Sequence, residues 1–199
     1  MMGTFSDWVL YLLAAAVLQN FVLSTGFGSS MTIRAARRPR DILLFGGLLT
    51  GFCLGTLLLS YPLNLLIGNG YWAKLFRPLL LISLTALLYI LVVLVLRKAA
   101  PGAYDRVRRL LPLTAFNNVV VGIALIANQQ LVVTFWGMVG LGLGTCIGVV
   151  LLCKLTAEAR ERTDHPDMPG AFRGLPSLLV FLGLLALALL GFSSSVRFL

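Results

Sequence analysis

The stretch "TAFNNVVVG", residues 114–122, places Asn117 and Asn118 side by side in a run that has no charged side chain from Leu110 to Cys153. Unsatisfied polar groups are costly in lipid, so amides in such a run are expected where they satisfy backbone groups that a regular helix leaves open. The stretch therefore predicts a transmembrane helix that is interrupted within the membrane.

The composition places the whole chain in a membrane. Of its 199 residues, 59% are hydrophobic and only 12% are charged, and the mean hydropathy is +0.96. Most of such a chain must face lipid or other apolar helices. We expect an all-α integral membrane protein that forms one membrane domain, residues 1–199, with no separate soluble domain.

Charged and turn residues divide the chain into six spans, because about 20 apolar residues are needed to cross about 30 Å of hydrocarbon. The uncharged segments, in order, are Trp8–Ile33, Ile42–Ser60, Pro78–Leu96, Leu110–Cys153, which divides at "NQQ" (128–130), and Gly174–Val196. Tyr61 and Pro62 mark the exit of the second span into an interfacial loop, which Tyr71 and Trp72 close.

The net charge of +9 is unevenly distributed. Arg34–Arg40, Arg97–Arg109 and Lys154–Arg173 are expected to be loops and carry 4, 5 and 4 Lys or Arg residues, 13 of the 16 in the chain. By the positive-inside rule these loops are cytoplasmic, so both termini face outward. Attraction to anionic membrane lipid accounts for the basic residues, and no aromatic residues are interleaved with them as a nucleic-acid surface would require.

Short matches indicate an internal repeat. Residues 54–56 and 143–145 both read Leu-Gly-Thr, and each follows a span that contains amides: Asn20 in the first span, Asn117 and Asn118 in the fourth. Three spans separate the halves, so equivalent helices cross in opposite directions. We expect two inverted three-helix repeats, 1–99 and 100–199, whose first and fourth helices are interrupted at the functional site.

Two interpretations of these amides remain open. In the structural one, Asn20, Asn117 and Asn118 cap half-helices or hydrogen-bond between spans. In the functional one, they line an ion path or flank a cofactor. The two are compatible. All Asp and Glu residues lie in expected loops or at Asp7, which disfavours a proton pump that relies on a buried acid of this chain.

Three stretches resemble a known family in order and spacing: "AVLQNFVLSTGFG" (16–28), "RKAAPGAYDRVRRLLPLTAFNNVVVGIAL" (97–125) and "MPGAFRGLPSLLVFLGLLALALLGFSS" (168–194). They resemble the six-span subunits shared by the Rnf electron transport complex and the sodium-translocating NADH:quinone oxidoreductase, and the outward N-terminus matches the Rnf A type rather than the E type. The most specific part is "AFRG" followed by a span that ends in "GFSS".

The resemblance implies a subunit of the bacterial cytoplasmic (inner) membrane, non-catalytic in itself, within an NADH- or ferredoxin-linked ion-translocating oxidoreductase. Its partners would be other subunits of the redox complex, among them a paralogous six-span subunit. The paralogous pair would enclose an iron-sulfur centre between half-helices, through which electrons pass, coupled to sodium or proton movement.

The cysteines that the family supplies to this centre are absent here. The resemblance assigns their positions to Gly28 and Asn118, and Asn20 and Asn117 flank the same half-helices. Iron in such centres is held by thiolates, for which an amide is a poor replacement. We therefore expect this chain to be a divergent member without the cluster ligands, and we assign it no catalytic or metal-ligating residue.

The three cysteines lie elsewhere, at positions 53, 146 and 153. Cys53 and Cys146 adjoin the two Leu-Gly-Thr matches, so the repeat could bring them together at a new cluster site. Against this, they lie on the second and fifth spans, and a cysteine in an apolar helix is usually a small buried hydrophobe. We favour the packing role.

Glycines repeat at intervals of four on the second and fifth spans: Gly47, Gly51 and Gly55, and Gly140, Gly144 and Gly148. Each set predicts a helix face that a neighbouring helix approaches closely. Leucine at Gly51 or at Gly144 is therefore predicted to prevent assembly.

Two functions from different classes remain. The first is a membrane subunit of an Rnf/Nqr-type redox complex that supports electron transfer or ion coupling. The second is a stand-alone small transporter or accessory membrane protein that keeps the inverted-repeat scaffold without a redox role. The missing cysteines favour the second function. The matching loops favour the first, because the sequence of a loop that contacts no partner changes readily among relatives.

Overall fold

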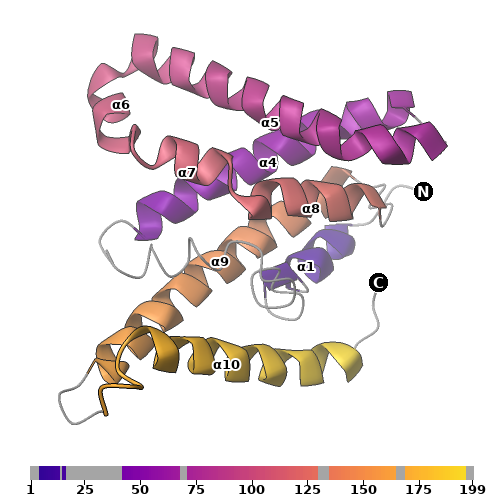
Figure 1. The fold of residues 1–199 in the computed structure, drawn as a ribbon. Coiled ribbons are helices and arrows are strands. Elements are labelled where there is room, and N and C mark those ends of the chain that lie inside the picture. The colour runs from indigo at the N-terminus through magenta and orange to yellow at the C-terminus, as the bar shows by residue number, and fades with distance from the viewer. Residues whose placement is uncertain are drawn as a thin grey trace.

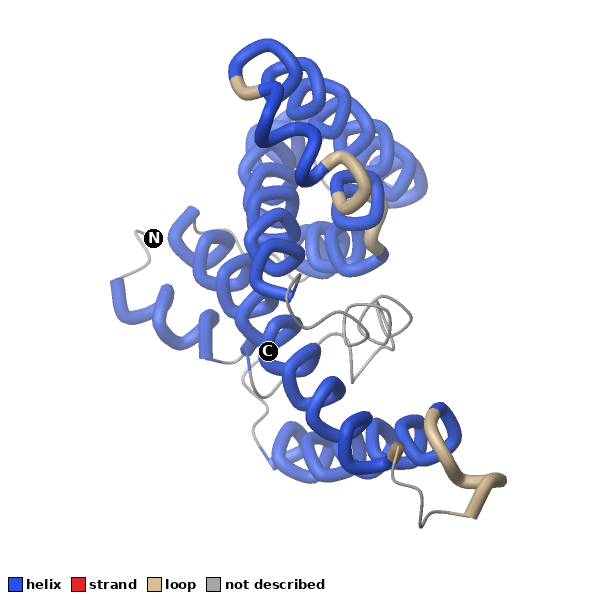
Figure 2. The backbone as a smooth tube through the Cα atoms, turned by 90° about the vertical axis from the view of Figure 1, so that its left-hand side faces the viewer, coloured by secondary structure: helices blue, strands red, loops and turns tan. Residues whose placement is uncertain are grey.

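A computed structural model describes residues 5–13, 15–16, 42–67, 71–129, 135–164 and 169–195. All secondary structure in these ranges is helical (Figure 2). The α-helices are α1 (Phe5–Leu13), α4 (Ile42–Ile67), α5 (Tyr71–Ala99), α6 (Pro101–Val107), α7 (Leu111–Ala115), α8 (Asn118–Gln129), α9 (Phe135–Thr163) and α10 (Leu175–Ser195). The prediction of an all-α protein is therefore confirmed for the described part of the chain.

Three of the described helices are long and apolar enough to cross a membrane: Ile42–Leu63 in α4, Leu75–Ala99 in α5, and α9. Two shorter apolar stretches are Leu111–Leu125, across α7 and α8, and Leu175–Leu189 in α10. The exposed side chains of α5 and α10 are mainly apolar, as at Leu87 and Leu187, which are 62% and 68% exposed. Such faces are expected to contact lipid or other subunits.

Helix α4 lies at the centre of the bundle. It contacts α5, α7, α8 and α9, and in Figure 1 it runs between α9 and the layer formed by α5, α7 and α8. Its residues Leu49, Cys53 and Leu57 are completely buried, and they recur every four residues, so they share one helix face. This face forms the centre of the hydrophobic core.

The predicted end of the second span is wrong. Helix α4 continues through Pro62 to Ile67, and α5 already begins at Tyr71, so Tyr71 and Trp72 belong to a helix rather than to a loop. Proline removes one helical hydrogen bond but is tolerated in membrane helices whose neighbours compensate. The ring of Tyr61 packs edge-on against Phe135 at the start of α9, with 6.4 Å between ring centroids, and this contact supports the last turns of α4.

Regions expected to lie outside the spans are partly helical, and Arg97–Arg109 contains both the end of α5 and α6. Arg77 lies inside α5 and is 7% exposed, and α9 extends ten residues beyond Cys153, to Thr163. Arg162 pairs with Glu158 one turn earlier at 3.0 Å, an arrangement that favours helix over loop at the polar end of α9. The charge count treated every polar stretch as a loop and missed these helical extensions.

The glycine prediction is confirmed at Gly140 and Gly144 of α9 and fails on part of α4. A Cβ atom at Gly140 would meet the backbone of Trp8, and one at Gly144 would meet the carbonyl oxygen of Leu12, so α1 lies directly against α9. On α4, Gly55 faces the side chain of Leu88, but nothing lies within 4 Å of a Cβ built at Gly47 or Gly51. These two positions face outward within the described structure, because the buried face of α4 lies on its other side.

Candidate functional site

The fourth predicted span is broken where the two asparagines stand. Helix α7 ends at Ala115 and α8 begins at Asn118. The break is anchored by Asn117, which is 3% exposed. Its side-chain Oδ1 accepts a hydrogen bond from the backbone N–H of Val119 at 3.1 Å, and its carbonyl accepts one from the N–H of Val120 at 2.9 Å. Asn117 is thus the N-cap of α8, as the structural interpretation of the amides requires.

The end of α7 is also satisfied locally. The N–H of Phe116 donates to the Pro112 carbonyl at 3.1 Å. The Thr114 hydroxyl donates to the carbonyls of Leu110 and Leu111, each at 3.0 Å. The ring of Phe116 packs against Tyr89 of α5, with centroids 5.3 Å apart. Backbone groups on both sides of the break are therefore hydrogen-bonded, which stabilises the interruption.

The other predicted site residues are not assembled with Asn117 in the structure. Asn118 is the first residue of α8 and is exposed, so the two neighbouring amides have opposite surroundings. Gly28 and Asn20 lie outside the described residues. The interruption predicted for the first helix falls in the same undescribed part of the chain.

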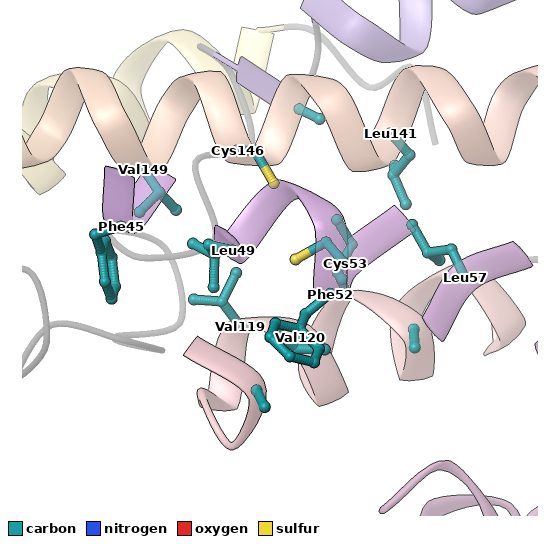
Figure 3. Packing of buried hydrophobic residues seen from close by; sticks show 14 of the residues in the cluster. Phe45, Leu49, Phe52, Cys53, Leu57, Val119, Val120, Leu141, Cys146 and Val149 are labelled. Atoms are coloured by element: carbon teal, nitrogen blue, oxygen red, sulfur yellow. The ribbon is translucent and has the colours of Figure 1, made fainter. Parts of the chain in front are cut away.

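The break adjoins the hydrophobic core, which holds all three cysteines of the chain. Val119 and Val120, the second and third residues of α8, are buried in one cluster with Cys53 of α4 and Cys146 of α9 (Figure 3). Helix α4 meets α9 closely where Gly46 faces Val150 and where Leu54 and Leu57 face Gly142. Cys53 and Cys146 lie between these two contact points, so both thiols stand at the same level of the helix crossing. The expectation that these thiols are buried is confirmed, and the structure also brings them to the same crossing of α4 and α9.

The residues present do not fit an iron-sulfur centre at the positions that the family resemblance assigns. Asn118 offers a neutral amide where a thiolate is required. In the described ranges, no group of three or more His, Cys, Asp or Glu side chains is placed to hold a metal ion. Cys53 and Cys146 would supply only half of a four-thiolate set, and they lie in a cluster of hydrophobic side chains.

Sequence reasoning missed the buried threonines of the core, among them Thr56 and Thr145. Thr56 is completely buried, and its hydroxyl has no hydrogen-bond partner in the described structure. Thr145, its counterpart in the other Leu-Gly-Thr match, donates to the Leu141 carbonyl at 2.9 Å. The match itself was the available signal, since it placed a threonine on each core helix.

The "AFRG" stretch forms the turn that leads into α10. Gly174 has φ +82°, a backbone conformation that favours glycine, and its carbonyl accepts a hydrogen bond from the N–H of Leu178 at 3.2 Å. Arg173 pairs with Asp164 at 3.0 Å, which links this turn to the end of α9. The Ser177 hydroxyl donates a hydrogen bond to the Phe172 carbonyl. The motif therefore sets the direction of α10.

These features define a helical membrane protein whose core contains a capped break between two half-helices. Residues 8–196 match the family described as "Rnf-Nqr subunit, membrane protein". The chain belongs to this family, as its sequence resemblance predicted.

Relatives of known name cover nearly the whole chain. The A-type subunit of the "Ion-translocating oxidoreductase complex" of Alcanivorax borkumensis is 31% identical, covering 96% of this chain and 99% of its own. The protein of the same name from Syntrophotalea carbinolica is 30% identical, with 94% and 97% covered. The A-type subunit of the "Na(+)-translocating ferredoxin:NAD(+) oxidoreductase complex" of Acetobacterium woodii is 29% identical, with 93% and 96% covered. All three are of the type that the sequence indicated.

Proposed function

We propose that this chain is a membrane subunit of an Rnf/Nqr-type ion-translocating electron transport complex and that it supports electron transfer or ion coupling without catalysing a reaction itself. The observation that carries this proposal is the buried, capped break at Asn117 in a chain that matches the A-type subunits end to end. Irregular backbone at membrane depth is tolerated where it is buried in protein or lines a cavity, and half-helix ends are where such folds bind ions or cofactors.

We further propose the finer architecture expected from the sequence: six spans in two inverted repeats, 1–99 and 100–199, paired with a paralogous six-span subunit. The central crossing of α4 and α9, one helix from each half, supports this arrangement. The exposed apolar faces of α5 and α10 provide surface for subunit contacts and lipid.

Complex membership is tested by affinity purification of the tagged full-length chain from its native membrane. Flavin-bearing and NADH- or ferredoxin-oxidising subunits are expected to co-purify in fixed ratio with it. Recovery of the chain alone, from membranes in which those subunits are present and assembled with one another, would favour the second candidate, a stand-alone transporter. The amide in place of a thiolate at Asn118 is the observation in favour of that candidate.

The cofactor proposal is that this chain supplies no cluster ligand at positions 28 and 118. Iron and acid-labile sulfide in the purified chain are expected to fall well below one cluster per polypeptide, because amide and glycine cannot replace thiolates. The double variant Gly28→Cys, Asn118→Cys tests whether positions 28 and 118 are the family's cluster-ligand positions. A rise in bound iron and sulfide in this variant alone would support that assignment. Stoichiometric iron and sulfide in the unaltered chain would contradict the proposal.

The orientation proposal is that both termini lie outside the bacterial cytoplasmic membrane. Alkaline phosphatase, which is active only outside, is expected to be active when fused after Leu199 and inactive when fused in the basic segment Arg97–Arg109. A green fluorescent protein fused at the same two places should show the reverse pattern. Fluorescence from the C-terminal fusion would reverse the proposed topology.

A further inference from the structure

Two free thiols lie at the crossing of the two central helices. Cys53 of α4 is completely buried, and Cys146 of α9 is 2% exposed. The close contacts of Gly46 with Val150 and of Gly142 with Leu54 and Leu57 bracket the two cysteines along the α4–α9 crossing, and Figure 3 shows the Cys146 sulfur directed towards α4, the helix that carries Cys53. Neither thiol takes part in the capped break, so their placement calls for its own explanation.

The repeat explains why the two thiols lie at the same level of the crossing. When the two Leu-Gly-Thr matches are superimposed, Cys53 corresponds to Gly142, which lies one helical turn before Cys146 on the same face of α9. A Cβ at Gly142 would meet the side chains of Leu54 and Leu57 at 2.8 and 3.0 Å. This glycine therefore lets α4 approach α9 closely at the level of the thiols.

We propose that Cys53 and Cys146 form a redox-active dithiol that a lipid-soluble two-electron oxidant of the quinone class converts to a disulfide joining α4 to α9. Two S–H bonds break and one S–S bond forms. The two electrons and two protons pass to the quinone, which leaves as the quinol. Both thiols stand at the same level of the α4–α9 crossing, so a side-chain rotation and a small approach of the helices can bring the sulfur atoms to disulfide distance.

The position of the pair selects the class of oxidant. Both thiols lie in membrane-length helices and are shielded from water, which disfavours polar oxidants such as glutathione disulfide. Among the described residues, the neighbouring surface of α4 is open, because Thr50 is only partly buried and nothing lies within 4 Å of a Cβ built at Gly47 or Gly51. An apolar oxidant in the bilayer can therefore approach the pair when the helix contact opens locally.

The disulfide would fix the central contact of the bundle. Helices α4 and α9 belong to different halves of the chain, and a bond between residues 53 and 146 closes a loop of more than ninety residues. Such a link restricts any movement of one half against the other. The oxidised protein is thus held in the helix arrangement of this structure, and the reduced one is free to change it.

The test uses the full-length protein in membrane vesicles with a short-chain ubiquinone analogue as oxidant. After denaturation, the thiols are counted with a maleimide that adds visible mass. The wild type is expected to fall from three reactive thiols to one and to recover all three after dithiothreitol. Intact-mass measurement should show the loss of two hydrogens per chain, without a quinone adduct.

Cys153 provides the matched control. It is a buried thiol two helical turns from Cys146 on the same helix, about 10 Å along its axis and beyond disulfide reach. Cys153→Ser should fall from two thiols to none, whereas Cys53→Ser and Cys146→Ser should each keep two. Three thiols remaining in membrane-inserted wild type, a bond that involves Cys153, or a bond between two chains would each overturn the proposal.

Discussion

Replacing Gly144 by leucine is expected to lower the amount of this protein in the membrane several-fold. A side chain at this position would collide with the carbonyl oxygen of Leu12 and lie 2.9 Å from the Cβ of Ala15. The carbonyl belongs to the backbone of the α1 segment and cannot rotate away as a side-chain tip could. The whole of α1 would have to leave α9, with a cost at or above the roughly 1–3 kcal/mol typical of overpacking.

A loss of stability of this size is enough to change cellular abundance several-fold, because unfolded chains are continuously degraded. The measurement is quantitative blotting of the membrane fraction. Gly51→Leu is the matched control, because nothing in the described structure lies within 4 Å of its added Cβ. The Gly51→Leu variant should accumulate in the membrane at the normal level. Normal accumulation of Gly144→Leu would show that α1 does not pack on α9 as described.

Asn117→Ala is expected to destabilise the protein by about 1–3 kcal/mol. The substitution removes the N-cap of α8, which is worth about 0.5–2 kcal/mol, and it leaves the buried N–H of Val119 without the acceptor that Oδ1 provides at 3.1 Å. A buried donor left unsatisfied costs about 1–3 kcal/mol, and this cost overlaps with the loss of the cap. The midpoint of thermal unfolding in detergent should fall by about 2–4 °C for each kcal/mol.

Two variants separate capping from other roles of the amide. Asn117→Asp keeps an acceptor oxygen and should lose less stability than Asn117→Ala, since aspartate is also a good N-cap. Asn118→Ala changes an exposed residue and should be nearly neutral. Equal unfolding midpoints for Asn117→Ala and Asn118→Ala would show that the cap does not hold the break.

The broken helix could be predicted from sequence because its signal is local. An amide in an apolar run has few ways to be satisfied in lipid, and Asn is a preferred N-cap, so "TAFNNVVVG" carried most of the information. The sequence could not tell which of the two amides is buried. Asn117 and Asn118 are chemically identical, and the distinction arises from the face of α8 that α4 covers.

The outward-facing glycines show the complementary limit. Gly47 and Gly51 have the same spacing as Gly140 and Gly144, and spacing alone predicted the same role for both pairs. Only the second pair meets α1. A periodic pattern defines a helix face, but the element that covers the face is chosen by packing between segments far apart in the chain.

Taken alone, the sequence determined that this is a helical membrane protein of the Rnf-Nqr family with a helix break within residues 114–122, because hydropathy, capping preference and family motifs all depend on residues near one another in the chain. The tertiary structure decided that Asn117 is the buried cap, that α1 lies on the Gly140–Gly144 face, and that Cys53 and Cys146 lie at the same crossing of α4 and α9. These three results depend on contacts between distant segments, whose register is fixed by close packing of complete helix faces.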